Sequence, residues 1–107
     1  MRIIYKHTAL LDLQRTRDYI ADTLKNKSAA QKLVTSVFHA VSLLSDHPMM
    51  GTALNSRYDA DSDIRFFIVS KQLVFYQTVD DSLISVIRIL DGRQDYMSIL
   101  FYSNHQK

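Results

Sequence analysis

Three apolar segments in the second half of the chain constrain its fold most strongly. They cover residues 64–70, 72–79 and 83–90 and are rich in Ile, Val, Phe and Tyr, the side chains that favour β-strands. The turns expected at 70–71 and 80–82 are very short, and links of this length join antiparallel neighbours. The third segment is apolar at both alternating sets of positions, which predicts a central strand covered on both faces of the sheet.

The first half of the chain is predicted to form a strand followed by two helices. Residues 2–6 alternate like a short strand, and Thr8 is the expected N-cap of a helix whose apolar residues recur at helical spacing as far as Leu24. Residues 28–31, Ser-Ala-Ala-Gln, have the form of a capping box that starts a second helix. This helix must end just before Pro48, which disfavours helical geometry in the preceding residue.

A short link between these helices predicts an antiparallel hairpin, with Asn26 suited to a left-handed position in the turn. Segregated helices and strands indicate a single α+β domain over residues 1–107. In this domain an N-terminal strand and the helix hairpin pack on an antiparallel sheet of three to four strands. A short C-terminal helix is expected over residues 94–102.

Composition excludes several kinds of site. The chain has no cysteine, which excludes disulfides, thiolate zinc sites and thiol nucleophiles. Its four histidines lack the spacing of metal ligands, and two glycines cannot form a phosphate-binding loop. Asp59, Asp61 and Asp63 are expected in a solvated turn, because the glycine and glutamate of a calcium loop are missing. We predict no metal and no cofactor.

The sequence also bears on location and partners. No apolar run approaches the roughly 18 residues that span a bilayer, and the N-terminal MRIIYKH lacks the apolar region of a signal peptide. We therefore expect a cytoplasmic protein without a membrane partner. The net charge of +2 permits a nucleic acid or an acidic protein as partner and requires neither.

Two arginines in the segment 83–101 are the first candidates for function. Arg88 lies inside an apolar strand, where burying a guanidinium is costly unless it is paired or used. Arg93 follows the predicted Asp-Gly turn. Both could bind phosphate or an acidic surface through bidentate hydrogen bonds. Alternatively, Arg88 pairs with Asp91 or Asp95 and fixes the final turn.

Four other residues are secondary candidates. Arg65 could lie beside these arginines on a neighbouring strand, or it could be an ordinary exposed sheet residue. Tyr96 could serve as a proton donor, or it could pack in the core or an interface. Met49 and Met50 are adaptable apolar side chains that suit a partner surface, with core filling as the alternative.

As a whole, the chain resembles the RelE/ParE superfamily of type II toxin–antitoxin toxins, and within it the ParE-like branch. Five segments in the family's order carry the resemblance: Asp12-Leu13 with residues 18–21; residues 28–34; Leu43-Leu44 with His-Pro-Met-Met-Gly at 47–51; Val-Phe-Tyr at 74–76; and Ile-Arg-Ile-Leu-Asp-Gly-Arg-Gln-Asp-Tyr at 87–96. The resemblance implies a small α+β toxin that an antitoxin wraps and silences. One branch of the superfamily blocks DNA gyrase, and another cuts mRNA in the ribosome.

Two departures from the nuclease pattern favour the gyrase branch. RelE-like nucleases typically carry a basic residue just before the apolar-Tyr segment of the middle strand, where this chain has Gln72-Leu73. Lys71 lies nearby, but in a predicted turn. The loop before the sheet, often rich in lysine in the nucleases, is acidic here at residues 59–63, and carboxylates repel an RNA backbone.

We therefore predict a bacterial growth-inhibiting toxin of the plasmid-stabilisation type that binds and inhibits a target such as DNA gyrase. A cognate antitoxin should neutralise it, and the complex should bind operator DNA through the antitoxin. The residues predicted to bind the target or the antitoxin are Arg88, Arg93, Tyr96, Met49 and Met50. The alternative is a metal-independent, ribosome-dependent mRNA endonuclease that uses Arg88, Arg93, Tyr96 and Arg65. A third possibility is an inactive member that binds only its antitoxin.

Overall fold

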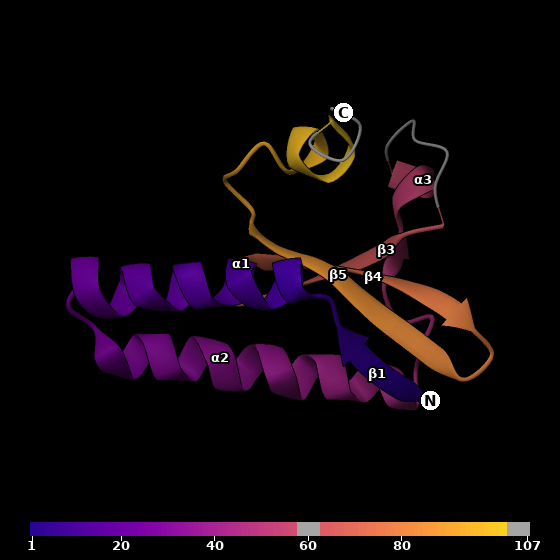
Figure 1. The fold of residues 1–107 in the computed structure, drawn as a ribbon, viewed down its shortest axis with the longest axis horizontal. Coiled ribbons are helices and arrows are strands. Elements are labelled where there is room, and N and C mark those ends of the chain that lie inside the picture. Colours follow the sequence, from indigo (N-terminus) through magenta and orange to yellow (C-terminus); the bar gives the residue numbers. More distant parts are fainter. Residues whose placement is uncertain (58–62, 103–107) are drawn as a thin grey trace.

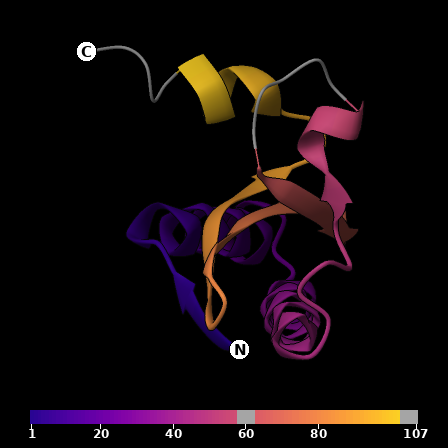
Figure 2. The ribbon, with the colours of Figure 1, turned by 90° about the vertical axis from the view of Figure 1, so that its right-hand side faces the viewer.

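A computed structural model describes residues 1–57 and 63–102 and has the α+β architecture expected from the sequence (Figure 1). Two long helices lie side by side against one face of a β-sheet. The C-terminal turn and a short helix, α3 (Leu54–Arg57), lie on the opposite side (Figure 2). Asp59 and Asp61 of the predicted acidic loop lie outside the described residues.

The sheet has five strands in the order β1-β5-β4-β3-β2, rather than the three to four expected. They are β1 (Arg2–Tyr5), β2 (Thr52–Ala53), β3 (Arg65–Val69), β4 (Gln72–Asp80) and β5 (Leu83–Asp91). The predicted antiparallel meander is confirmed in β3, β4 and β5. However, β1 pairs with β5 in parallel, so the sheet is mixed and not wholly antiparallel. The helix hairpin lies within the long crossover that such a parallel pair requires.

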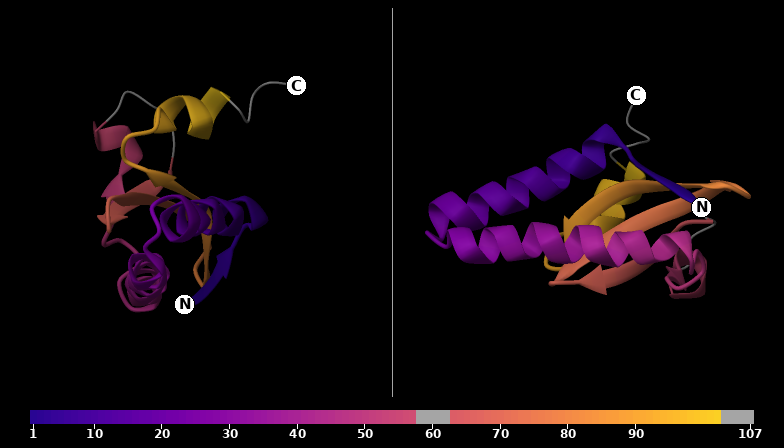
Figure 3. Two further views of the ribbon diagram at one scale, coloured as in Figure 1. Left: turned by 90° about the vertical axis from the view of Figure 1, so that its left-hand side faces the viewer. Right: turned by 90° about the horizontal axis from the view of Figure 1, so that it is seen from below.

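The helices form the predicted hairpin. The first consists of α1 (His7–Asp18) with a π-helical turn, η1 (Tyr19–Thr23). The second consists of α2 (Lys27–Ser42) with a 3-10 turn, η2 (Leu43–Ser45), and it ends before Pro48 as expected. The C-terminal end of the second helix lies beside the N-terminus of the chain (Figure 3, right). There the Met1 amino group donates to the Ser45 carbonyl at 3.2 Å.

Both predicted helix starts were wrong. The first helix begins at His7, so Lys6 occupies the N-cap position and no side chain caps the helix. Thr8 lies within the first turn, where its hydroxyl donates to the Ile87 carbonyl at 3.3 Å. The second begins at Lys27, where the Asn26 carboxamide oxygen accepts from the Ala29 amide at 3.0 Å. Asn26 therefore supplies the cap that we expected from Ser28. Asparagine is one of the residues whose side chains satisfy free amides at a helix start.

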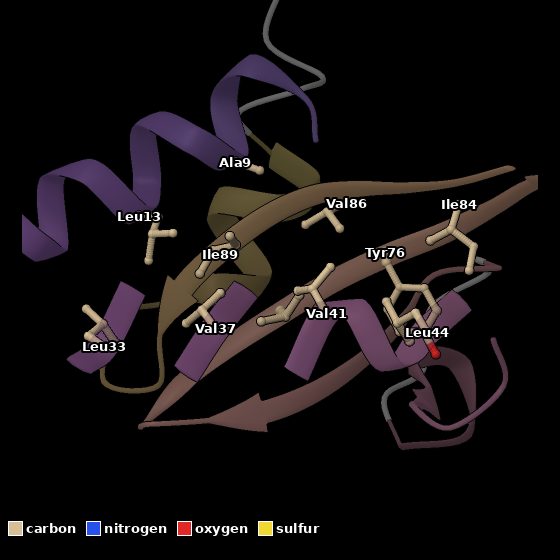
Figure 4. Packing of buried hydrophobic residues seen from close by; sticks show 11 residues of the cluster. Ala9, Leu13, Leu33, Val37, Val41, Leu44, Tyr76, Ile84, Val86 and Ile89 are labelled. Carbon is tan, nitrogen blue, oxygen red and sulfur yellow. The ribbon is translucent and has the colours of Figure 1, made fainter. Parts of the chain in front are cut away.

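Two apolar clusters pack on opposite faces of the sheet. The helix-side cluster includes Ala9, Leu13, Val37, Val41, Tyr76, Val86 and Ile89 (Figure 4). The other joins Leu54, Phe66, Leu73, Phe75, Leu90 and Leu100 beneath the C-terminal π-helical turn, η3 (Ser98–Tyr102). Because β5 contributes Ile89 to one cluster and Leu90 to the other, its prediction as a central strand covered on both faces is confirmed.

Tyr76 ties the loop after the second helix to the sheet. Its hydroxyl donates to the Pro48 carbonyl and accepts from the Gly51 amide, both at 2.9 Å. A Cβ atom at position 51 would lie 2.7 Å from this hydroxyl oxygen and 2.9 Å from the Phe66 carbonyl oxygen. Position 51 therefore requires glycine because the backbone approaches Tyr76 and β3 so closely.

Candidate partner-binding site

The side chain of Arg88 is held inside the fold. Its Nε and Nη2 atoms donate to the two carboxylate oxygens of Asp12 at 2.7 and 2.8 Å. The side-chain exposures are 19% for Arg88 and 7% for Asp12, so the pair is largely shielded from water. These hydrogen bonds raise the pKa of Arg88 further above its usual range. Arg88 is thus paired internally, as the alternative interpretation expected, but its partner is Asp12 on α1 and not Asp91 or Asp95.

Asp12 also closes the outer edge of β5. Strand β1 pairs with β5 only as far as Val86, and beyond that point α1 replaces β1 along the edge. There the Ile89 amide donates to the Asp12 carboxylate at 3.0 Å. Buried amides require such acceptors, so Asp12 holds both the Arg88 side chain and the edge of β5 in place.

Arg93 has the opposite environment. It lies after β5 and forms an ion pair at 3.1 Å with Asp91, while 87% of its side chain remains exposed. The Arg93 guanidinium lowers the pKa of the Asp91 carboxyl, and a hydrogen bond from Gln72 contributes less to the same shift. Arg93 therefore presents a fixed but solvent-accessible cation at the end of the sheet.

Arg93 borders an open groove of about 550 Å³. Its lining residues are Leu24, Phe66, Ile68, Lys71, Leu73, Asp91, Gly92, Arg93 and Tyr96. The groove lies at the end of the sheet that carries the β3–β4 turn, near the tip of the helix hairpin. The floor is apolar, and two cations face one carboxylate at its margin. Such a surface suits an apolar side chain accompanied by a negative charge.

The groove depends on the β3–β4 turn and on the backbone that follows β5. Ser70 and Lys71 both have positive φ, 50° and 67°, which gives the two-residue β3–β4 turn the backbone twist that hairpins favour. The Gly92 amide donates to the Lys71 carbonyl at 3.0 Å. This bond places Lys71 and Arg93 on the same margin of the groove.

Tyr96 is the other predicted residue that lines the groove. Its ring lies 5.9 Å from the Phe75 ring, at an interplanar angle of 39°. The aromatic body thus packs on the cluster beneath η3, and the residue also forms part of the groove wall.

The structure separates the remaining candidates from this groove. Arg65 donates to the Gly51 carbonyl at 2.6 Å and so supports the loop that carries Met49 and Met50. These two methionines are 61% and 41% exposed, so they do not fill the core. Arg65 and Arg88 are held by separate partners, Gly51 and Asp12, and do not converge on one site.

Sequence reasoning missed Leu24 and Ile68 as surface residues. Leu24 follows the helical spacing of the core stripe, yet it is 55% exposed because it lies at the hairpin tip. Ile68 alternates like a buried strand residue, yet it is 66% exposed. No sequence signal distinguishes either residue from its buried neighbours.

Two further features, a cluster of metal ligands and a membrane-spanning helix, are absent from the part of the chain that the structure describes. Within residues 1–57 and 63–102, no three His, Cys, Asp or Glu side chains gather where they could hold an ion. The helices of those same ranges are too short or too polar to cross a membrane.

Comparison with known proteins identifies the family. The fold is similar to that of a chain in the chromosomal ParDE TA system from P. aeruginosa, with a TM-score of 0.67 and 19% sequence identity. The similarity covers 85% of this chain and 95% of that chain. A family model described as the ParE toxin of the type II toxin–antitoxin system, parDE, matches residues 3–96. The chain therefore belongs to the ParE toxin family. No curated protein matches its sequence significantly.

Proposed function

We propose that this chain arrests bacterial growth by binding and inhibiting DNA gyrase and that a cognate antitoxin neutralises it. Membership of the ParE toxin family over residues 3–96 is the observation that carries this proposal. The complex of toxin and antitoxin would bind operator DNA through the antitoxin, and the pair would serve plasmid stabilisation.

Two features of the structure favour binding over RNA cleavage. The middle-strand position at which RelE-like nucleases carry a cation holds Gln72, which is 3% exposed. Arg88, a candidate on β5, already gives two of its donors to Asp12. Phosphoryl chemistry at a ribose needs groups that reach the reacting atoms, and neither side chain is placed to do so.

One observation supports the nuclease as a second candidate. Lys71, Arg93 and Tyr96 line the same groove; the two cations have the charge to bind a phosphate, and the phenol has a proton to give to a leaving oxygen. The Asp91 carboxylate also lines the groove. Its negative charge repels a phosphate, and this weighs against the nuclease.

Expression of the chain without an antitoxin separates the two candidates. Plasmid supercoiling and mRNA integrity are measured in the same arrested cells. We expect growth arrest, loss of negative supercoiling and intact messages. Codon-positioned cuts in translated messages with normal supercoiling would establish the nuclease instead, and normal growth with abundant soluble protein would indicate an inactive member.

Co-expression with the protein encoded by the neighbouring gene tests the second half of the proposal. We expect growth to recover and the two proteins to purify together. If growth remains arrested although the product of the neighbouring gene is present in soluble form, that product is not the antitoxin.

A further inference from the structure

The outer edge of β3 is only partly paired. Strand β2 pairs Thr52 with Phe66 and Ala53 with Arg65, and β2 is the last strand of the sheet on that side. Among the described residues, no strand lies beside the remaining part of β3, residues 67–69.

Ile68 is the residue whose backbone faces this open edge. The Leu54 amide donates to the Ile64 carbonyl at 2.8 Å, so Ile64 directs its backbone groups away from β4. Successive residues of an antiparallel strand direct their N–H and C=O groups to opposite sides. Ile68 therefore directs its amide and carbonyl outward, as Ile64 and Phe66 do, but it lies beyond the end of β2.

The loop anchored by Tyr76 explains why β2 stops before reaching Ile68. If the register of β2 and β3 continued, Met50 would stand opposite Ile68. Instead the Gly51 amide donates to the Tyr76 hydroxyl, and the Met50 amide donates to the His47 carbonyl at 3.1 Å. The chain is thus held in a turn where it would otherwise have extended the sheet.

Two other margins of the sheet are protected. At β1 the edge is four residues long and carries Arg2, with Lys6 directly after it, and cations discourage edge-to-edge pairing. Along β5, α1 covers the edge through Asp12. The open end of β3 reads Phe-Ile-Val and carries no charge, so it lacks the usual protection of an edge strand.

The groove described above begins beside this open edge. Ile68 lines it, and its side chain is 66% exposed. Lys71 follows two residues after the end of β3, and Arg93 lies on the same margin. Arg93 is already paired with Asp91, whereas Lys71 forms no ion pair with any carboxylate of the described residues. An occupant should therefore combine backbone hydrogen-bonding groups, an apolar side chain and a carboxylate.

We propose that an extended segment of the antitoxin docks at this edge and groove. Its backbone exchanges hydrogen bonds with the Ile68 amide and carbonyl, one apolar side chain packs on Ile68 towards Leu24, and an adjacent Asp or Glu pairs with Lys71. Strand addition of this kind obtains its affinity from main-chain bonds and its specificity from alternate side chains. The choice of an antitoxin as occupant rests on the toxin function proposed above.

Amide hydrogen exchange of the unmodified toxin tests the backbone contact directly. NMR follows the exchange of single amides in the free toxin and in its complex with the protein from the neighbouring gene. We expect the Ile68 amide to exchange rapidly in the free toxin and to become at least about tenfold slower in the complex. The Phe67 amide, which faces β4, is the internal control and should be protected in both states.

Paired substitutions test the same contact through affinity. Ile68→Pro removes the outward amide, a change that an edge strand tolerates, while Ile68→Ala removes the side chain and keeps the amide. Lys71→Glu reverses the proposed charge contact, and Lys32→Glu on the exposed face of α2 is its control. We expect roughly tenfold weaker antitoxin binding for Ile68→Pro and Lys71→Glu, a smaller loss for Ile68→Ala, and none for Lys32→Glu.

The outcomes separate the two proposals. If toxin and neighbouring protein associate but the Ile68 amide keeps its free exchange rate, the docking edge is wrong and the toxin function stands. Wild-type affinity in folded Ile68→Pro and Lys71→Glu would likewise overturn the docking edge alone. If the two proteins do not associate at all, both the antitoxin assignment and the docking edge fall.

Discussion

Two arginines five residues apart occupy opposite environments in this molecule. Arg88 lies within β5 and gives its donors to Asp12, a residue 76 positions away in the sequence. Arg93 lies just beyond β5 and pairs with its near neighbour Asp91 while remaining 87% exposed. The same residue type thus stabilises the fold at one position and remains an exposed charge at the other, where we propose that a partner binds it. A long-range, shielded pair holds the fold together, whereas a short-range, exposed pair contributes little to stability.

Asp12→Ala should be the most damaging change on the structural side of this comparison. It leaves the Arg88 guanidinium without its carboxylate and the Ile89 amide without its acceptor. Removing one partner of a largely buried pair costs about 3 kcal/mol, and we expect the free energy of unfolding in urea to fall by that amount. Asp18→Ala, which breaks the exposed Arg17–Asp18 pair, is the control and should leave the unfolding midpoint unchanged. Equal effects of the two variants would show that the shielded pair stabilises the fold no more than the exposed one.

Arg88→Lys should have an intermediate effect. Lysine keeps the charge but cannot reproduce the two parallel hydrogen bonds of a guanidinium to a carboxylate. We expect a loss of about 1–2 kcal/mol in urea unfolding, with the fold retained. A lysine variant as stable as the wild type would show that charge alone, and not the bidentate geometry, holds α1 against β5.

Arg93→Ala should leave stability almost unchanged and still weaken recognition. The side chain is exposed, and exposed ion pairs contribute little to folding. We expect an unaltered thermal midpoint by circular dichroism, together with weaker binding to gyrase or antitoxin measured by calorimetry. Tyr96→Ala is unsuitable as a control because it also removes core packing, so Lys32→Glu serves that purpose. A large fall in the melting midpoint of Arg93→Ala would make Arg93 a structural residue like Arg88.

The smallest expected effect is on how folding stability changes at acid pH, through the pKa of the Asp91 carboxyl. Arg93 lowers the pKa of this carboxyl below its ordinary value of 3.8. A depressed carboxyl pKa stabilises the folded state above the unfolded pKa, and this contribution disappears as the pH falls through the folded pKa. Between pH 5 and about 2, the stability of Arg93→Ala should therefore decline slightly less than that of the wild type. If the free energies of unfolding of the wild type and Arg93→Ala, measured in urea, fall equally over this pH range, Arg93 does not lower the pKa of Asp91.

Elements governed by local pattern could be predicted from the sequence. The three strands of the meander have short-range alternation and tight links, and each predicted end lies within one residue of the end in the structure. The helix hairpin likewise follows from apolar spacing and from Pro48. By contrast, the cap at Asn26 was missed because Ser28 also satisfies a capping pattern, and only the turn geometry decides between them.

Features that depend on distant parts of the chain could not be predicted. The pairing of β1 with β5 requires knowing where the helix hairpin returns the chain, and the Asp12–Arg88 pair follows only once α1 is placed along β5. The open edge at Ile68 depends on the Tyr76 hydroxyl drawing Gly51 out of the sheet. In each case a contact between segments far apart in sequence determines the outcome, and local pattern carries no information about it.

A supercoiling assay with purified DNA gyrase and increasing amounts of this chain tests the proposed inhibition most directly. We predict that the wild-type protein inhibits supercoiling in proportion to its occupancy of gyrase and that the neighbouring antitoxin restores the activity. Gyrase that remains fully active at toxin concentrations that arrest growth would contradict gyrase inhibition as the function of this chain.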